Sequence, residues 1–191
     1  MTNSHKDQRV GVFVDIQNMY YSAIRLYDSK VDFNRILADA VDGRRLIRAF
    51  AYVIKADVGE EESFFEALEK IGFEVRSKDL QVFTGGQKKG DWDVGIAMDA
   101  ARMAPKLDTV VLVSGDGDFT DLVQYLRSRG CRVEVMAFRK SASAKLIAEA
   151  DEFHDLDGEN KYLRKKMNPK RARRKTDANN PGMKDYSRGH R

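Results

Sequence analysis

The sequence contains little cysteine, proline or tryptophan. Its 191 residues include one cysteine, three prolines and one tryptophan. A single cysteine, Cys131, excludes an internal disulfide and a cysteine-based zinc site built from one chain. Because nothing in the composition calls for an oxidising environment, a reducing compartment is the simplest expectation, and we predict a cytoplasmic protein.

Long apolar runs are also missing. No stretch reaches the roughly 20 apolar residues that a membrane-spanning helix needs. Residues 1–9 are polar and lack the apolar centre of a signal peptide, so we interpret them as an N-terminal extension. The sequence therefore predicts no membrane partner.

Histidine is scarce as well. His5, His154 and His190 lie near the termini or late in the chain, and none has an obvious nucleophile partner in the sequence. Catalysis by a Ser/His/Asp or Cys/His arrangement is therefore poorly supported.

Charge is present but unevenly distributed. From residue 161 onward, twelve Lys and Arg face two Asp and Glu, whereas the preceding residues contain twenty-two against twenty-eight. An acidic body with a basic arm suits a protein that gathers a polyanion and handles cations in an acidic site. A tail that only keeps the protein soluble is an equally simple alternative. Over residues 160–191 we expect a basic, disordered tail.

The order of apolar segments predicts one α/β domain over residues 10–159. Strands are expected at 10–15, 46–54, the first half of 73–83, 109–114, 132–138 and, at an edge, 153–156. Helices are expected at 16–28, 32–41, 60–71, 91–103, 119–129 and 143–150. This alternation favours a mainly parallel central sheet covered by helices on both faces, which is a three-layer α/β/α sandwich of the Rossmann-like kind. An exposed sheet edge near Phe138 suggests a homodimer as a further expectation.

Aspartates follow the two most apolar strands. The first strand ends on Asp15, and the strand at 109–114 leads through Gly115 to Asp116 and Asp118. Open parallel sheets bind ligands beyond the carboxyl ends of their strands, where the strand order reverses. If these two strands are neighbours there, their carboxylates converge and require a cation between them. Oxygen ligands of this type suit Mg²⁺ or Mn²⁺.

A fourth carboxylate, Asp93, stands at the start of the helix expected at 91–103. It begins a helical stripe that we expect to lie on the sheet, made of Asp93, Ile96, Ala97 and Ala100. Its side chain should therefore point inward near the sheet edge. Capping of the helix is the structural alternative for Asp91 and Asp93. Asp99 is a weaker candidate for the metal site, where it would lie behind the ligands and not bind the metal itself.

Several other residues have both a structural and a functional interpretation. Asp118 is a good candidate for a helix cap, whereas capping explains Asp15 and Asp116 less well. Asn18 could orient a water or a phosphate oxygen, or be a satisfied polar residue of the first helical turn. Lys88 and Lys89, in a glycine-rich loop over 84–90, are candidate phosphate-binding residues. That loop is not a Walker A motif, and the later ligands of an EF-hand are missing after Asp118.

Three segments, taken together and in this order, resemble the signature segments of NYN domains, in particular the LabA-like branch of the PIN-like nuclease superfamily. They are Val12-Phe-Val-Asp15-Ile-Gln-Asn18, Lys89-Gly-Asp-Trp-Asp93-Val-Gly-Ile-Ala-Met-Asp99 and Ser114-Gly-Asp116-Gly-Asp118-Phe-Thr-Asp-Leu. The resemblance implies a PIN-like fold and a metal-dependent ribonuclease. It maps the acidic site of the family onto Asp15, Asp93, Asp116 and Asp118, with Asn18 nearby. Many relatives approach the second aspartate with a shorter segment, so Asp91 is an alternative to Asp93.

These observations lead to one functional hypothesis and two alternatives. The first is hydrolysis of RNA by one or two Mg²⁺ or Mn²⁺ ions held by the four aspartates, with no protein nucleophile. The second is a non-catalytic module that binds RNA or a protein through the same fold. The third is a phosphatase or sugar-nucleotide enzyme that uses Asp116 and Asp118.

Overall fold

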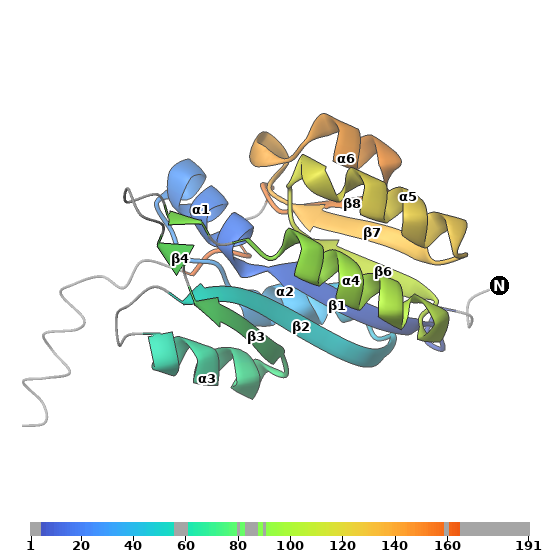
Figure 1. Ribbon diagram of the computed structural model, residues 1–191, viewed down its shortest axis with the longest axis horizontal. Helices are drawn as coiled ribbons and strands as arrows, with labels where there is room; N and C mark the ends of the chain where they lie inside the picture. Colours follow the sequence, from blue (N-terminus) through green and yellow to red (C-terminus); the bar gives the residue numbers. More distant parts are fainter. Residues whose placement is uncertain are drawn as a thin grey trace, which may run out of the picture.

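A sheet of six parallel strands forms the centre of the protein in the computed structural model (Figure 1). The structure describes residues 5–55, 61–79, 81–82, 88–89, 91–158 and 161–164. The strands of this sheet are β1 (Arg9–Asp15), β2 (Arg45–Lys55), β3 (Glu74–Asp79), β6 (Thr109–Val113), β7 (Arg132–Ala137) and β8 (Glu152–Asp155).

Helices cover both faces of the sheet, which confirms the predicted three-layer sandwich (Figure 1). One face carries α1 (Ile16–Tyr27), α2 (Phe33–Val41) and α3 (Glu61–Ile71). The other carries α4 (Asp93–Met103), α5 (Thr120–Ser128) and α6 (Ala144–Glu149). Short 3₁₀ turns lie at Ala104–Lys106, Gly117–Phe119 and Arg139–Ser141. Among the described residues, no helix combines the length and hydropathy needed to cross a membrane.

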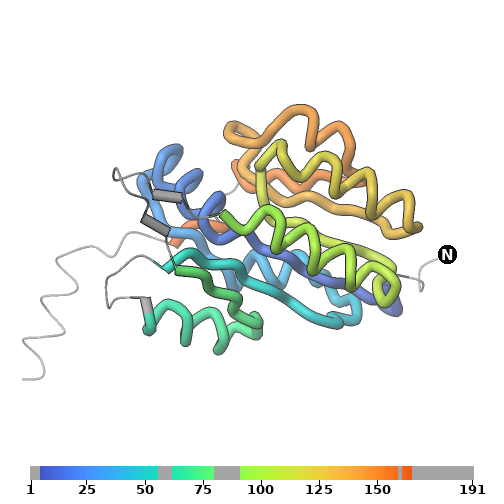
Figure 2. Tube along the Cα trace, viewed as in Figure 1, coloured from blue at the N-terminus to red at the C-terminus, as the bar shows by residue number. Residues whose placement is uncertain are grey.

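The strands are ordered β3-β2-β1-β6-β7-β8, so the point where the strand order reverses lies between β1 and β6. The chain first builds outward from β1 to β3, and then returns to the other side of β1 to build β6, β7 and β8 (Figure 2). The condition on which the predicted site depends, that the two most apolar strands are neighbours, is met, because Val10 to Val14 of β1 pair with Thr109 to Val113 of β6. The reversal point of such a sheet is where a ligand site is expected.

The central strands are apolar on both sides because helices cover both of their faces. Val12 and Val14 contribute to the core under α1 and α2, whereas Phe13 contributes to the core under α4 and α5. Asp15 continues the alternation of β1, so its side chain emerges on the face of α4 and α5. The site residues are thereby placed on a rigid, fully packed frame.

One predicted edge of the sheet differs in the structure, while the edge strand expected at 153–156 is present as β8. The proposal of an exposed edge near Phe138 is wrong, because β8 pairs with β7 and Phe138 is completely buried. The edge strands of the described sheet are β3 and β8. The dimer suggested by that edge therefore has no support from Phe138.

The segment predicted as a glycine-rich loop, 84–90, contains one strand of a short antiparallel pair. Strand β4 (Gln81–Val82) pairs with β5 (Lys88–Lys89), so the two lysines lie in a strand and not in a loop. The rest of the predicted loop, residues 84–87 and 90, lies outside the described residues.

Residues 161–164, which the prediction assigned to the tail, pack against the body. The Tyr162 hydroxyl donates to Asp39 (2.8 Å), and the Arg164 backbone N–H donates to the Lys30 carbonyl (2.8 Å). Tyr162 is buried. The remainder of the predicted basic tail, residues 165–191, lies outside the described part of the chain.

Candidate active site at the carboxyl edge of the sheet

The carboxyl ends of β1 and β6 bring Asp15 and Ser114 side by side. The last paired residues of the two strands are Val14 and Val113, so the next residue of each strand stands at the sheet edge. The Ser114 hydroxyl donates to Asp15 Oδ2 at 3.4 Å. Ser114 is completely buried, and Asp15 is 8% exposed. The edge of the sheet therefore holds a carboxylate that is almost removed from solvent.

The negative charge of the buried Asp15 carboxylate is poorly compensated by its surroundings. Burial, together with the negative charges of Asp93 and Asp116, raises its pKa to about 6, although two hydrogen bonds favour the charged form. Those bonds come from Ser114 and from the Asn18 backbone N–H, which donates to Oδ1 at 3.0 Å. A cation placed among the aspartates would offset both the burial and the repulsion.

Asp116 begins the turn that follows β6. Its backbone N–H donates to Ser114 Oγ (3.2 Å), and its own Oδ1 accepts from the backbone N–H of Asp118 (3.0 Å). Capping is thus the role of Asp116 at the 3₁₀ turn, and not of Asp118 as predicted, because α5 begins two residues beyond Asp118. Asp15 also caps a helix, α1. The expectation that capping explains these two aspartates poorly is wrong.

Asn18 ties the two strand ends together. Its side-chain oxygen accepts a hydrogen bond from the Gly115 backbone N–H at 3.0 Å, across the gap between α1 and the end of β6. The side-chain oxygen of Asn18 therefore has a structural role, as a hydrogen-bond acceptor within the protein. A contact of Asn18 with substrate stays a prediction.

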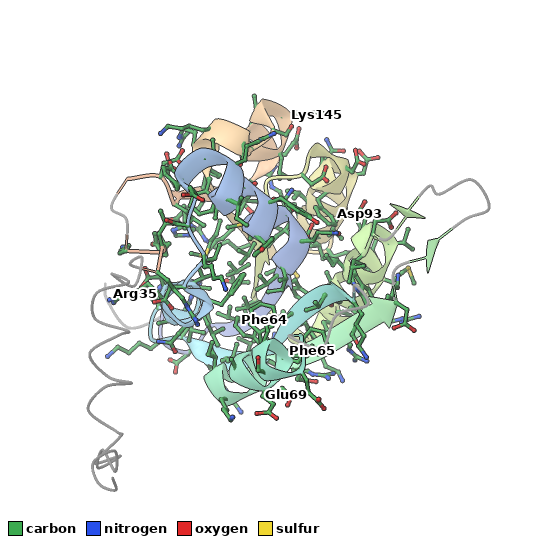
Figure 3. The ribbon with its side chains drawn as sticks, turned by 90° about the vertical axis from the view of Figure 1, so that its left-hand side faces the viewer. Arg35, Phe64, Phe65, Glu69, Asp93 and Lys145 are labelled. Carbon is green, nitrogen blue, oxygen red and sulfur yellow. The ribbon has the colours of Figure 1, made fainter. Side chains whose placement is uncertain are left out.

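Asp93 is the first residue of α4 and joins the group from the side. Its pKa is raised, first by burial and then by the charges of Asp116, Asp91 and Asp118, while Lys78 acts in the opposite direction. The expected stripe of α4 does face the sheet, since Ile96 and Ala100 are buried. In the view onto this edge of the sheet, Asp93 lies on the side that faces the reader (Figure 3). The four predicted aspartates therefore share one region and affect one another electrostatically.

Trp92 fixes the start of α4, which begins two residues later than predicted. The indole N–H donates to the Val53 carbonyl of β2 at 2.8 Å, and the ring packs on Tyr52 with centroids 5.2 Å apart. Lys78 lies over the same ring, 4.1 Å from its centroid. Because Trp92 is half-buried and held on both sides, it acts as an anchor for the residue that follows it, Asp93.

Replacing Gly95 by alanine tests this anchor. Alanine in a helix is normally favoured over glycine by about 1 kcal/mol. A methyl group here would lie 2.4 Å from Trp92 Cε3, so we expect a destabilisation of about 1–3 kcal/mol instead. Urea unfolding measures the change. In a Trp92→Ala background the same substitution should stabilise by about 1 kcal/mol, and a destabilisation there would show that the clash is not with the indole.

The other predicted site residues lie outside this group or cannot be placed in it. Asp91 is exposed, and Asp99 accepts a hydrogen bond from the Tyr52 hydroxyl at 3.0 Å, which occupies it in packing α4 on β2. The backbone of Lys88 and Lys89 is described, but their side chains are not. Their contact with phosphate stays a prediction.

Sequence reasoning missed the role of Ser114. Its hydroxyl donates to Asp15 and accepts from the Asp116 backbone, so it connects two of the aspartates. The available signal was its position, since a hydroxyl at the end of a fully apolar strand needs partners. Sequence reasoning also missed Lys78, whose charge acts on Asp93. Lys78 lies on the edge strand β3, which has no apolar pattern from which the direction of its side chains could be predicted.

The closest grouping of ligand atoms lies elsewhere in the sheet. Among the described residues, Glu134, Glu152 and His154 form one group whose ligand atoms all lie within 4.8 Å of one another. By distance alone this group could hold a metal. Glu134, however, already receives Arg44 on both oxygens (2.7 and 2.9 Å), with Arg132 at 3.1 Å and His154 at 3.4 Å. Two arginines and His154 occupy this carboxylate, so we interpret the group as a buried ion-pair cluster.

The aspartates at the carboxyl edge are more widely spaced and suit a different ligand. Their carboxylates are all oxygen donors, and none of the four forms an ion pair with a described Lys, Arg or His. Mg²⁺ takes one or two carboxylates and keeps several waters, which fits separated carboxylates better than a tight cage. The donor set therefore fits a hydrated divalent cation.

Comparison with known proteins gives three results. The NYN domain model matches residues 9–157, which is most of the chain. The low amplitude and bright protein LabA of Synechococcus elongatus is 25% identical over 173 residues, covering 86% of this chain and 92% of that protein. A crystal structure of a protein of unknown function from Vibrio parahaemolyticus is 37% identical with a TM-score of 0.77, covering 86% of this chain and all of the other. The chain belongs to the NYN domain family, within the PIN-like nuclease superfamily.

Proposed function

We propose that the protein is a metal-dependent ribonuclease whose active site comprises Asp15, Asp93, Asp116 and Asp118. The observation that carries the proposal is Asp15, a buried carboxylate at the reversal point of the sheet with a pKa raised to about 6 beside two more aspartates. Perturbed carboxylates in such a place indicate a functional site, and membership of the NYN family favours a nucleic acid substrate.

The four aspartates would hold Mg²⁺ or Mn²⁺, and a bound ion would supply charge stabilisation at the phosphate and a more acidic water. The rest of the site orients these carboxylates. Ser114 and the Asn18 backbone N–H hold Asp15, the Asp118 backbone N–H holds Asp116, and Trp92 holds the start of α4. If a water, and not the ribose 2′-hydroxyl, attacks the phosphate and displaces the 3′-oxygen, the products have 5′-phosphate and 3′-hydroxyl ends, and these are the ends we expect.

Replacing Asp116 by asparagine tests the proposal. The wild-type protein should cut a labelled single-stranded RNA with Mn²⁺ or Mg²⁺ and not with EDTA. Asp116→Asn should lower the cleavage rate by at least about a hundredfold, because it removes a ligand charge but keeps an oxygen that can cap the turn. Asp42→Asn is the matched control, since Asp42 is exposed, lies just before β2 at the amino edge, and has a left-handed backbone (φ 45°) that asparagine tolerates.

The outcomes separate the hypotheses. Cleavage that persists in EDTA or in Asp116→Asn would contradict an aspartate-bound metal. Binding of RNA without cleavage under either metal would favour the non-catalytic module, which the capping roles of Asp15 and Asp116 make physically reasonable. Hydrolysis of a small phosphoester with RNA left intact would favour a phosphatase.

Some finer expectations accompany this proposal. The basic residues from 161 onward would gather RNA near the acidic body. Substrate contacts by Asn18, Lys88 and Lys89 and a cytoplasmic location also remain predictions, as does the homodimer. Size-exclusion chromatography with light scattering tests the last of these.

A further inference from the structure

An aromatic cavity opens beside the acidic residues. Its volume is about 390 Å³, within the range of about 300–1,000 Å³ typical of small-molecule sites. Five aromatic residues line it, namely Tyr20 and Tyr21 of α1, Phe33 of α2, and Phe64 and Phe65 of α3. Phe64 and Phe65 lie on the same side of the molecule as Asp93, the side on which the strands end (Figure 3). The mechanism proposed above makes no use of this cavity.

Two residues that line the cavity are directly connected to residues of the acidic site. Ile16 lines it and follows Asp15 directly in the chain. Val53 also lines it, and the Val53 carbonyl accepts the indole N–H of Trp92, the residue before Asp93. The cavity lies on the α1–α3 face and Asp15 emerges on the α4–α5 face, so a chain of a few nucleotides that passes Asp15 and Asp93 would reach the cavity over the carboxyl edge of the sheet.

The lining has the chemistry of a nucleobase site. Tyr20 and Tyr21 are 39% and 61% exposed, which leaves their rings available to stack on a flat ligand. Among the described residues that line the cavity, two are cationic, Lys30 and Arg164, and none is acidic. Within the described part of the chain, neither Lys30 nor Arg164 forms an ion pair. Aromatic faces flanked by unpaired cations complement a base and its phosphates.

We propose that this cavity binds one nucleobase of a single-stranded RNA, adjacent to the phosphate held at the aspartates. The base stacks on Tyr20 or Tyr21, and Lys30 and Arg164 contact the neighbouring phosphates. The inference rests on the proposed function, because it assigns the cavity to the same substrate strand. It also predicts a preference for single strands over duplex RNA, whose bases are not free to enter a cavity.

Fluorescence anisotropy of a labelled 12-nucleotide single-stranded RNA tests the proposal. Binding is measured in EDTA with Asp116→Asn as the parent protein, so that the strand stays intact. Adding Tyr20→Ala and Tyr21→Ala should weaken binding about 5- to 150-fold. Tyr125→Ala is the matched control, because Tyr125 is an equally exposed tyrosine on α5 away from the cavity, and it should leave binding unchanged. Circular dichroism checks that each variant is folded.

Two further measurements separate base contacts from phosphate contacts. A set of RNAs is compared in which a single nucleotide, at a different position in each RNA, lacks its base. At one of these positions the loss of the base should weaken binding to the parent protein but not to the tyrosine variant. The logarithm of the binding constant falls as the logarithm of the salt concentration rises. Replacing both Lys30 and Arg164 by glutamine should reduce the magnitude of this slope by about 1.4, whereas the tyrosine changes should leave the slope unchanged.

The outcomes distinguish this inference from the proposed function. Metal-dependent cleavage together with unaltered binding by the tyrosine variant would overturn the inference alone. An absence of cleavage together with base-dependent binding through the tyrosines would overturn the nuclease and support the cavity. Conversion of a dimer to a monomer by the tyrosine changes, with RNA binding intact, would show that a second copy of the chain fills the cavity and would overturn the inference.

Discussion

Replacing Asp15 by asparagine is expected to stabilise the metal-free domain at pH 8 while abolishing RNA cleavage. Asp15 is 8% exposed, and burial together with the charges of Asp93 and Asp116 raises its pKa from 3.8 to about 6. Asparagine is nearly the same size, and its side-chain oxygen can still accept from the Asn18 backbone N–H. The substitution therefore removes an unfavourable charge and keeps the hydrogen bond.

The sign of the effect follows from proton binding. Between pH 3.8 and about 6, the folded protein holds the Asp15 proton more tightly than the unfolded chain does. Stability therefore falls as pH rises through this window, and the full penalty is present above it. A shift of about 2 pKa units corresponds to about 3 kcal/mol. For a domain of this size, that is roughly 6–12 °C in Tm.

Thermal unfolding in EDTA at pH 8 and pH 4 measures this prediction. Asp15→Asn should unfold at a higher temperature than the wild type at pH 8, and the difference should shrink at pH 4, where the carboxyl group is protonated. An equal or lower Tm at pH 8 would contradict it. Asp108→Asn is a control of opposite sign, because Arg9 lowers the pKa of Asp108 to about 2, so that variant should be less stable at pH 8.

Addition of metal connects this stability to function. If the aspartates bind Mg²⁺, the ion stabilises the folded wild type by mass action. The Tm of the wild type should then rise with Mg²⁺ concentration, whereas that of Asp15→Asn should respond much less. A wild-type Tm that ignores both Mg²⁺ and Mn²⁺ would argue against a metal site at these residues.

The place of the site could be predicted from the sequence because strand ends are local features. Val10 to Val14 and Thr109 to Val113 are runs that only a doubly covered strand explains, and each run leads directly into aspartate. Their adjacency was a condition of the predicted site, which the pairing of β1 with β6 meets at the point where the strand order reverses. Asp93 was found because helical periodicity indicates the buried face of α4.

The connections within the site were not predictable, because they depend on distances across the fold. Nothing in the sequence relates Asn18 to Gly115 or Trp92 to Val53, and both pairs are joined by hydrogen bonds to backbone groups. Backbone partners leave no signal in the residue types. Capping was likewise assigned to Asp118 and not to Asp116, since a 3₁₀ turn and a helix begin with the same residue pattern.

The buried ion pair under the other face shows the same limit on a larger scale. Glu134 pairs with Arg44, 90 residues away, and their side chains are 3% and 2% exposed. A charged residue between Val133 and Val135 gives no signal that position 134 is buried, nor that its partner comes from the turn just before β2. Burial alone would raise the pKa of Glu134, whereas hydrogen bonds from His154, Arg44 and Arg132 more than offset it and lower the pKa below its ordinary value.

Replacing Arg44 by methionine is expected to destabilise the domain by about 3–5 kcal/mol at pH 7, because it leaves the Glu134 carboxylate buried without its main partner. Urea unfolding measures the loss. The double variant Arg44→Met with Glu134→Leu should recover most of it, since two apolar residues fill the space without a buried charge.

This pair of variants also decides between an ion-pair cluster and a metal site at Glu134, Glu152 and His154. If Arg44 is the cation that compensates Glu134, EDTA should not lower the Tm of the wild type through this cluster. In a protein that carries Asp15→Asn, added Zn²⁺ or Mn²⁺ should then leave the Tm unchanged. If a metal occupies the cluster, removing Arg44 should tighten metal binding, because a competing cation is gone, and Arg44→Met should then be rescued by added metal. The double variant would not respond in either case, since it lacks the central carboxylate.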